Sequence, residues 1–197
     1  MSIEKTIADT AIDSRQRNRN RLLLVGIFAI FFGGLLIAGA LRFSGWQPSG
    51  MKNRGELLSP SADLRALVPR LDDGSAYRWA PVERRWRIAL APPADCAAAC
   101  VELARELDLV WQLFGKDADR VDILWIGTPP PPGATRGAAT RLLRADAALR
   151  ARLPRVDDPR GVPVYVVDPN GFVILRYAPG TDPGDLRADL SKLLKLM

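Results

Sequence analysis

The longest apolar stretch of the chain lies near its N-terminus. Residues 22–41 (LLLVGIFAIFFGGLLIAGAL) contain twenty consecutive positions without a charged side chain. At ~1.5 Å per residue, a helix of this length crosses the ~30 Å hydrocarbon core of a bilayer. The pattern therefore predicts a transmembrane anchor, preceded by a short cytoplasmic tail at residues 1–21.

Basic residues are concentrated on the N-terminal side of this stretch. They are Lys5, Arg15, Arg17, Arg19 and Arg21. By the positive-inside rule, this excess predicts a single-pass protein of the bacterial inner membrane, with its N-terminus inside and a periplasmic C-terminal domain. A cleaved signal peptide is the alternative, because Ala38-Gly39-Ala40 fits the cleavage pattern. Signal peptides usually have apolar regions of only ~7–15 residues, which favours a retained anchor.

Residues 42–84 predict a tether and an N-terminal extension. Structure-breaking residues are frequent at its start, at Gly45, Pro48 and Gly50. The segment GELLS at 55–59 indicates the beginning of a short strand. The segment DDG at 72–74 predicts a turn before a further strand at 76–82.

A regular alternation marks the start of the main domain, predicted at residues 85–197. Apolar Trp86, Ile88 and Leu90 alternate with other residues and predict a half-buried strand. A helix is predicted next, because an apolar stripe repeats at helical spacing before Gly115. The stripe consists of Leu103, Leu107, Val110, Trp111 and Phe114. RVDILWIG at 120–127 then predicts a buried strand.

The following segment predicts a helix and a hairpin. Residues 136–152 are rich in alanine and arginine, and predict a helix that ends before Pro154. The runs VPVYVV at 162–167 and FVILRY at 172–177 predict two strands joined by a turn. The turn DPNG places a proline and a glycine where a tight turn prefers them.

The chain closes with a predicted helix that Pro183 opens and that Thr181 or Asp182 caps. The order is therefore strand, helix, strand, helix, strand, hairpin strand, helix. This order predicts an α/β, thioredoxin-like domain. Right-handed crossovers would make its first three strands neighbours in a central, mostly parallel sheet with flanking helices and one antiparallel edge strand. The functional group of such a domain lies on the loop after the first strand.

Composition narrows the classes of function. The net charge is +6, but basic residues alternate with acidic ones, as in Asp63/Arg65 and Asp119/Arg120. No long basic patch with interleaved aromatic residues occurs, so we expect a solvated surface and no nucleic-acid partner. The chain contains no histidine. It also offers no hydrolytic triad, phosphate-binding loop or convincing carboxylate pair.

The two cysteines of the chain, Cys96 and Cys100, fall on the loop after the first strand and at the amino end of the predicted helix. The unpaired N–H groups of a helix start favour thiolate over thiol, and Asp95 is predicted to cap the helix. One helical turn separates the cysteines, so a disulfide between them is feasible. Three small alanines leave the pair open to a large partner.

Three uses of this pair remain open from the residues. The pair could exchange electrons with a disulfide, hold soft Cu(I) between two thiolates, or form a passive disulfide. A zinc site is not expected, because zinc usually takes four ligands and the chain offers two cysteines and no imidazole. No other cofactor is indicated.

Pro163 opens the third strand of the predicted domain. A cis-proline at this place of a thioredoxin-like domain faces the cysteines and presents backbone to a substrate strand. The alternative is an ordinary proline at the start of a strand.

The segment CAAAC, with ELDLVWQLFGKDADRVDILWIG and GVPVYVVDPNGFVILRY after it, resembles the Sco-like, thioredoxin-fold membrane proteins associated with cytochrome c oxidase assembly. The resemblance extends over residues 22–197 and is strongest over 86–127 and 162–177. It implies that a cytochrome c oxidase subunit or another assembly factor is the partner. It also implies copper binding through Cys96, Cys100 and one histidine.

Two departures from this family change the implied chemistry. Arg160 occupies the position of the family's histidine, five residues before Tyr165, and the usual proline after the first cysteine is absent. The leading hypothesis is therefore thiol–disulfide exchange by an oxidoreductase that assists oxidase assembly, with Cys96 attacking and Cys100 resolving. The resemblance implies the copper-ligand cysteines of oxidase subunit II as the target. A Cu(I) metallochaperone and a redox-inactive assembly scaffold are the alternatives.

Overall fold

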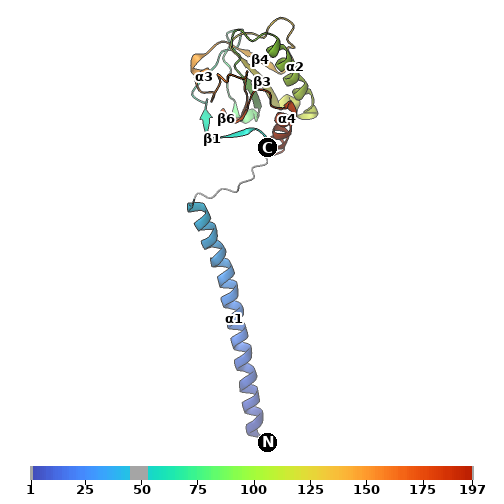
Figure 1. Ribbon diagram of the computed structural model, residues 1–197. Helices are drawn as coiled ribbons and strands as arrows, with labels where there is room; N and C mark the ends of the chain where they lie inside the picture. Colours follow the sequence, from blue (N-terminus) through green and yellow to red (C-terminus); the bar gives the residue numbers. More distant parts are fainter. Residues whose placement is uncertain (1, 45–52, 197) are drawn as a thin grey trace. The chain divides into compact units, whose positions relative to one another are not determined.

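The computed structural model describes residues 2–44 and 53–196, with side chains from residue 16 onward. The chain divides into two compact units, Met1–Met51 and Lys52–Met197 (Figure 1). Positions 45–52 of the predicted tether lie outside the described residues.

The described part of the N-terminal unit contains one long helix, α1 (Ser2–Phe43). Its part Gln16–Phe43 is long and apolar enough to cross a membrane, and none of its most apolar window is buried against protein. A helix that is apolar on all sides is stable where lipid surrounds it. Length and composition fit a membrane anchor and a signal sequence alike.

The C-terminal unit is a six-stranded mixed sheet with helices and loops on both faces. The strand order is β1-β6-β5-β2-β3-β4. The strands are β1 (Glu56–Asp63), β2 (Trp86–Leu90), β3 (Val121–Ile126), β4 (Thr140–Leu143), β5 (Val164–Val167) and β6 (Phe172–Tyr177). The helices are α2 (Ala98–Gln112), α3 (Ala147–Ala151) and α4 (Pro183–Leu194), with 3-10 turns at Pro81–Glu83 and Gly115–Arg120. The predicted thioredoxin-like order of β2, α2, β3, β5, β6 and α4 is present.

The two faces of the sheet have separate hydrophobic cores. One core joins β2, β3 and β5 to α2 and α4, with Ile88, Leu107 and Leu190 among its buried residues. The other lies under the segment that precedes β2 and under α3, with Trp79 and Leu149 among its buried residues. Because both faces are covered, every residue of β2 is buried, and the prediction of a half-buried strand was wrong.

The sheet is mixed, whereas a mostly parallel sheet was expected. Strand β2 is parallel to β3 but antiparallel to β5. Strand β4 is parallel to β3, so it ends at the same edge of the sheet at which β5 begins. The chain therefore enters β5 without recrossing the sheet, and the crossover rule for parallel neighbours does not apply there.

Two local predictions were wrong because tertiary contacts outweigh local propensity. The helix predicted over 136–152 is divided into strand β4 and the short helix α3. Strand β4 pairs with β3 on one side, and backbone bonds to residues 70–72 cover its other side. The strand expected at 76–82 is a loop with one bridge at Ala76, because Tyr77 and Trp79 turn into the core.

The hairpin and the last helix are confirmed. Strands β5 and β6 are antiparallel, and Gly171 closes their turn with φ of 100°. Asp182 caps α4 by accepting a hydrogen bond from the N–H of Gly184 at 2.7 Å. Strand β1, upstream of the predicted domain start, pairs with β6 and extends the sheet.

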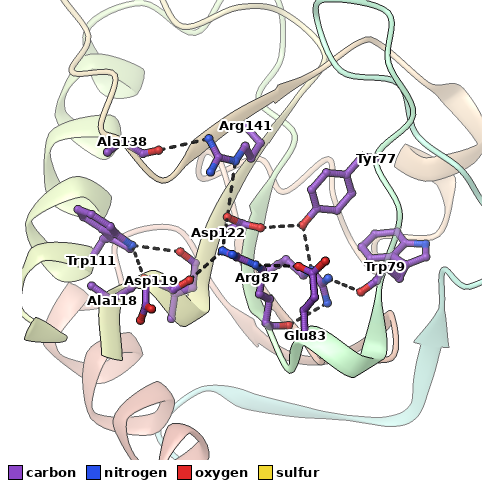
Figure 2. A network of polar contacts seen from close by, with 12 residues as sticks. Tyr77, Trp79, Glu83, Arg87, Trp111, Ala118, Asp119, Asp122, Ala138 and Arg141 are labelled. Carbon is purple, nitrogen blue, oxygen red and sulfur yellow. Dashed lines mark hydrogen bonds and ion pairs between the residues drawn. The ribbon is translucent and has the colours of Figure 1, made fainter. Parts of the chain in front are cut away.

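Arg87 is buried at the amino end of β2, with 1% of its surface exposed. Its guanidinium donates to the hydroxyl of Tyr77 (3.0 Å) and to the carbonyl oxygens of Arg85, Trp79, Asp168 and Pro169. Figure 2 shows the contacts of Arg87 with Tyr77 and Trp79. Arg87 therefore joins the hairpin turn, the loop before β2 and β2 itself.

Tyr77 links Arg87 to a buried carboxylate. Its hydroxyl donates to Asp122 at 3.1 Å, and Asp122 lies 3.6 Å from the guanidinium groups of both Arg85 and Arg141 (Figure 2). Burial, opposed in part by Arg87, raises the pKa of Tyr77 to about 12. The hydroxyl consequently stays protonated and can donate to Asp122 at neutral pH.

We predict that Arg87→Met lowers the free energy of unfolding by about 3 kcal/mol, because several buried acceptors lose their donor. Denaturant unfolding of the full chain in detergent measures this change. The control is Arg105→Met, which removes an exposed cation of α2 paired with Glu102 and should cost less than ~1 kcal/mol. Equal losses in the two variants would contradict a structural role for Arg87.

Asp189 of α4 holds the first residues of the C-terminal unit in place by hydrogen bonds. Its Oδ2 accepts hydrogen bonds from the N–H groups of Arg54 (2.6 Å) and Gly55 (3.0 Å) and from the hydroxyl of Tyr177 (3.0 Å). Lys192 donates to the other oxygen at 3.1 Å. A Cβ atom at Gly55 would lie 2.5 Å from the Tyr177 ring, so the close approach requires glycine. Burial alone would raise the pKa of Asp189, but the donated hydrogen bonds outweigh burial and lower it.

We predict that Asp189→Asn destabilises the protein by about 1–3 kcal/mol at neutral pH. The folded state depresses the pKa of Asp189, so its stabilisation is present above the unfolded-state value of ~3.9 and is lost as pH falls through the folded-state value. The difference in unfolding free energy between wild type and variant should therefore stay nearly constant from pH 6 to about pH 4. It should shrink as the pH is lowered further towards 3. A difference that is constant over this range would show that the charge of Asp189 contributes nothing.

Candidate redox site

The cysteine pair lies at the carboxyl end of β2, on the loop into α2. Cys96 precedes the helix, whose N-cap is Ala97, while Cys100 lies in the first turn. The two are joined in a disulfide, with 5.6 Å between their Cα atoms. Cys96 is therefore on the loop, two residues ahead of the helix.

Asp95 does not cap α2, and this prediction was wrong. The N-cap Ala97 has no side-chain acceptor, and Asp95 is exposed. The N–H of Cys96 instead donates to the carbonyl of Pro93 at 3.3 Å, which closes a separate turn before the helix. That turn delays the start of α2 by two residues beyond the position that a cap at Asp95 would require.

The two sulfur atoms have different surroundings. Cys100 is completely buried in the core between β2 and α2, while Cys96 is half-buried at its margin. The alanines between them, residues 97–99, are exposed, as the sequence predicted. A large reactant can therefore approach Cys96 and cannot approach Cys100.

Pro163 lies just before β5 and is buried. Its peptide bond with Val162 is trans; among the described residues the cis bond is Ser59–Pro60. The structure thus has the ordinary proline at the start of a strand. Val162, rather than Pro163, lines the groove beside α2.

Arg160, which the sequence resemblance places at the position of the Sco histidine, lines the same groove and forms an ion pair with Asp158. Its guanidinium donates to both oxygens of Asp158 at 3.1 Å, and Asp158 also accepts a 2.6 Å hydrogen bond from the buried Arg176. Hydrogen bonds from Arg160, and then from Arg176, hold the pKa of Asp158 well below its usual range. Asp158 thereby fixes the loop before β5.

The residues present provide a poor copper site. In the described part of the chain, no group of three or more histidine, cysteine or acidic side chains is arranged to hold a metal ion. The two sulfurs of Cys96 and Cys100 are the soft ligands, and Arg160 cannot complete them. Copper would need a further ligand from another molecule.

Sequence reasoning missed the groove next to the cysteines. It runs between α2 and the segments 160–164 and 177–183, and Glu106 lies on its wall. An acidic residue directly beside Leu107, at the border of the apolar stripe of α2, was the available signal. The opposite wall of the groove is formed by segments that are distant in the sequence, and no local sequence pattern indicates that they lie together.

We predict that Cys96 of the reduced protein reacts with iodoacetamide on the order of tenfold faster than Cys100, because only the thiol of Cys96 is accessible. Mass spectrometry of the two alkylated sites over time measures both rates. In denaturant the rates should become equal. Equal rates in the folded protein would refute the difference in accessibility.

Comparisons with known proteins agree with this architecture. The sequence profile of the family described as "Transmembrane-like, thioredoxin-like, C-terminal domain" matches residues 86–197, more than half of the chain. No curated protein sequence gives a significant match.

Solved structures share the fold at low sequence identity. Yeast Sco1 with copper bound superposes with a TM-score of 0.53 at 13% identity, covering 75% of this chain and 96% of that one. Bradyrhizobium japonicum ScoI with copper bound gives 0.46 at 17% identity, covering 64% and 95%. Xanthomonas campestris peroxiredoxin Q gives 0.45 at 16% identity, covering 74% and 98%. These similarities show the fold alone. The profile match over residues 86–197 establishes that the chain belongs to the transmembrane-like, thioredoxin-like family.

Proposed function

We propose that the protein performs thiol–disulfide exchange through Cys96 and Cys100 on the outer side of the bacterial inner membrane. One observation carries this proposal: the bonded pair has one accessible sulfur and one fully buried sulfur. An exchange site needs this asymmetry, because the partner must reach one sulfur while the second is kept from the partner and resolves the mixed disulfide. A disulfide that closes so few residues restricts the unfolded chain little, so a purely structural role is a weak explanation.

The reaction proceeds in two balanced steps. The Cys96 thiolate attacks one sulfur of a partner disulfide, forming a mixed disulfide and releasing the second partner sulfur as a thiolate. The Cys100 thiolate then attacks the sulfur of Cys96 and releases the first partner sulfur. The partner gains two electrons and, with two protons, becomes a dithiol, while Cys96 and Cys100 become a disulfide. A second dithiol protein restores the starting state by the same steps in reverse.

Helix α1 and the charges before its apolar part support the membrane location. Arg17, Arg19 and Arg21 precede the uncharged residues 22–41, which supports an inside N-terminus. The cysteines would then lie in an oxidising compartment, where disulfide chemistry is usual.

Cytochrome c oxidase assembly is the process we propose for this chemistry. The support is the resemblance of CAAAC and its flanking segments to Sco-like proteins. The proposed targets are the copper-ligand cysteines of oxidase subunit II, which must be reduced before they bind metal, or an assembly factor that carries them. Reduction of the partner disulfide by Cys96 would prepare those thiols without any copper bound to this chain.

We predict that Cys100→Ser in the full chain accumulates a mixed disulfide with its partner, because the resolving thiolate is absent. Cys96→Ser and the double Cys96→Ser/Cys100→Ser variant should accumulate none. Non-reducing electrophoresis of membranes from cells producing each variant measures the adduct, and mass spectrometry identifies the trapped protein. Loss of the adduct on treatment with dithiothreitol is the control for its chemistry.

The reduction potential separates the competing functions. A potential above about −300 mV is expected for an exchange site. A lower potential together with no trapped partner would indicate a passive disulfide in an assembly scaffold. Stoichiometric Cu(I) uptake by the wild type that Cys96→Ser abolishes would instead indicate a metallochaperone.

A further inference from the structure

A continuous groove begins beside the cysteine pair. Two cavities, each of about 260 Å³, share Leu103, Glu106, Val162, Pro179 and Gly180 as lining residues. The first cavity starts at Ala99, next to Cys100, and the second extends along α2 to Leu107. Both lie between α2 and the loops at the carboxyl edge of the sheet, where thioredoxin-like and other α/β domains place their ligands.

The length of the groove suits a short extended peptide. Ala99 and Glu106 are seven residues apart in α2, which corresponds to ~10.5 Å along the helix axis. An extended chain covers this distance in about three residues at ~3.3 Å each. Cys96 lies three residues ahead of Ala99. A partner residue about three to five positions from the cysteine that Cys96 attacks would therefore reach Glu106.

The groove is acidic although the whole chain carries a net charge of +6. The carboxylates of Glu102, Glu106 and Asp182 line it, against the guanidinium of Arg160. Three of these four charged groups have partners within the protein. Glu102 pairs with Arg105, Asp182 caps α4, and Arg160 pairs with Asp158.

Glu106 is the exception among these groups. It is half-buried, and no hydrogen bond or ion pair joins its carboxylate to any residue that the structure describes. Arg105 feels its charge, but the hydrogen bonds of Arg105 go to Glu102. Leu103, Leu107 and Val162 limit the hydration of this carboxylate, so a cation placed in the groove would be stabilised there.

We infer that the groove binds an extended segment of the redox partner and that Glu106 selects a lysine or arginine about three to five residues from its reacting cysteine. This inference rests on the proposed exchange function and adds a charge requirement to its substrate. An anionic lipid or nucleic-acid surface does not fit, because the groove would repel it. Glu106 is a specificity-determining residue and takes no part in the sulfur chemistry.

The kinetic test uses the reduced full chain in detergent and short peptides whose single cysteine is activated as a mixed disulfide with thionitrobenzoate. The peptides contain Lys, Gln or Glu three, four or five positions from the cysteine, on either side, with glycine spacers. We expect the Lys peptide to react on the order of fivefold faster than the Gln peptide, and the Glu peptide to be slowest. Rising salt should reduce the difference.

The matched variants are Glu106→Gln and Asp119→Asn. Glu106→Gln keeps the side-chain size and should abolish the preference for Lys. Asp119→Asn removes an exposed carboxylate beyond the end of α2, outside the groove, and should retain it. Thermal unfolding checks that both variants are folded. A Lys preference that survives Glu106→Gln, or that is lost in Asp119→Asn as well, would overturn the role of Glu106.

A binding measurement separates this inference from the exchange function. The same peptides with serine in place of cysteine are titrated into the wild-type protein, and their affinities are compared by calorimetry. Preferential binding of the Lys peptide without any exchange would refute the proposed function and leave the groove as a docking site. Exchange without any charge preference, in rate or in binding, would refute the groove inference and leave the function standing.

Discussion

Strand β2 is buried on both faces, and the other elements of the domain cover it or extend its sheet. Its burial requires α2 and α4 on one side and the segment from Leu64 to Trp79 with α3 on the other. The same constraint explains why Arg87 needs so many acceptors, since a buried guanidinium must be satisfied within the protein. The two ends of β2 then have different tasks. The amino end carries the polar network around Arg87, and the carboxyl end presents the cysteine loop.

The sequence predicted the elements whose signals are local. Helix α2, the β5–β6 hairpin and α4 each have a repeating apolar pattern together with a glycine, a proline or a capping residue at the boundary. The helix predicted over 136–152 was wrong. The alanines there favour a helix, but pairing with β3 makes Thr140–Leu143 a strand. The prediction that Asp95 caps α2 was wrong for a similar reason, because the composition gives no sign of the turn closed by Pro93 and Cys96. The direction of β5 depends on which edge of the sheet the preceding chain reaches, and no single segment encodes it.

The candidate site was predictable in its chemistry and less so in its geometry. The pair Cys96 and Cys100 stands out because the chain has no other cysteine and no histidine. The different accessibility of the two sulfurs follows from how α2 packs on β2. Arg160 could be identified as a departure from the Sco pattern, but its attachment to Asp158 and Arg176 depends on the fold. Glu106 could not be identified as a site residue from the sequence, because the loops at 160–164 and 177–183 form the opposite wall of its groove.

The location of Cys100 inside the core connects electron transfer to conformational stability through a thermodynamic cycle. The oxidised and reduced proteins differ in unfolding free energy by the same amount by which folding changes the free energy of reducing the disulfide. For a two-electron couple, each ~30 mV of that change corresponds to ~1.4 kcal/mol. The packing of β2 against α2 is thus one of the determinants of the potential, and substitutions there would shift the potential without touching either cysteine. Evolution could tune the driving force of such a protein through its hydrophobic core.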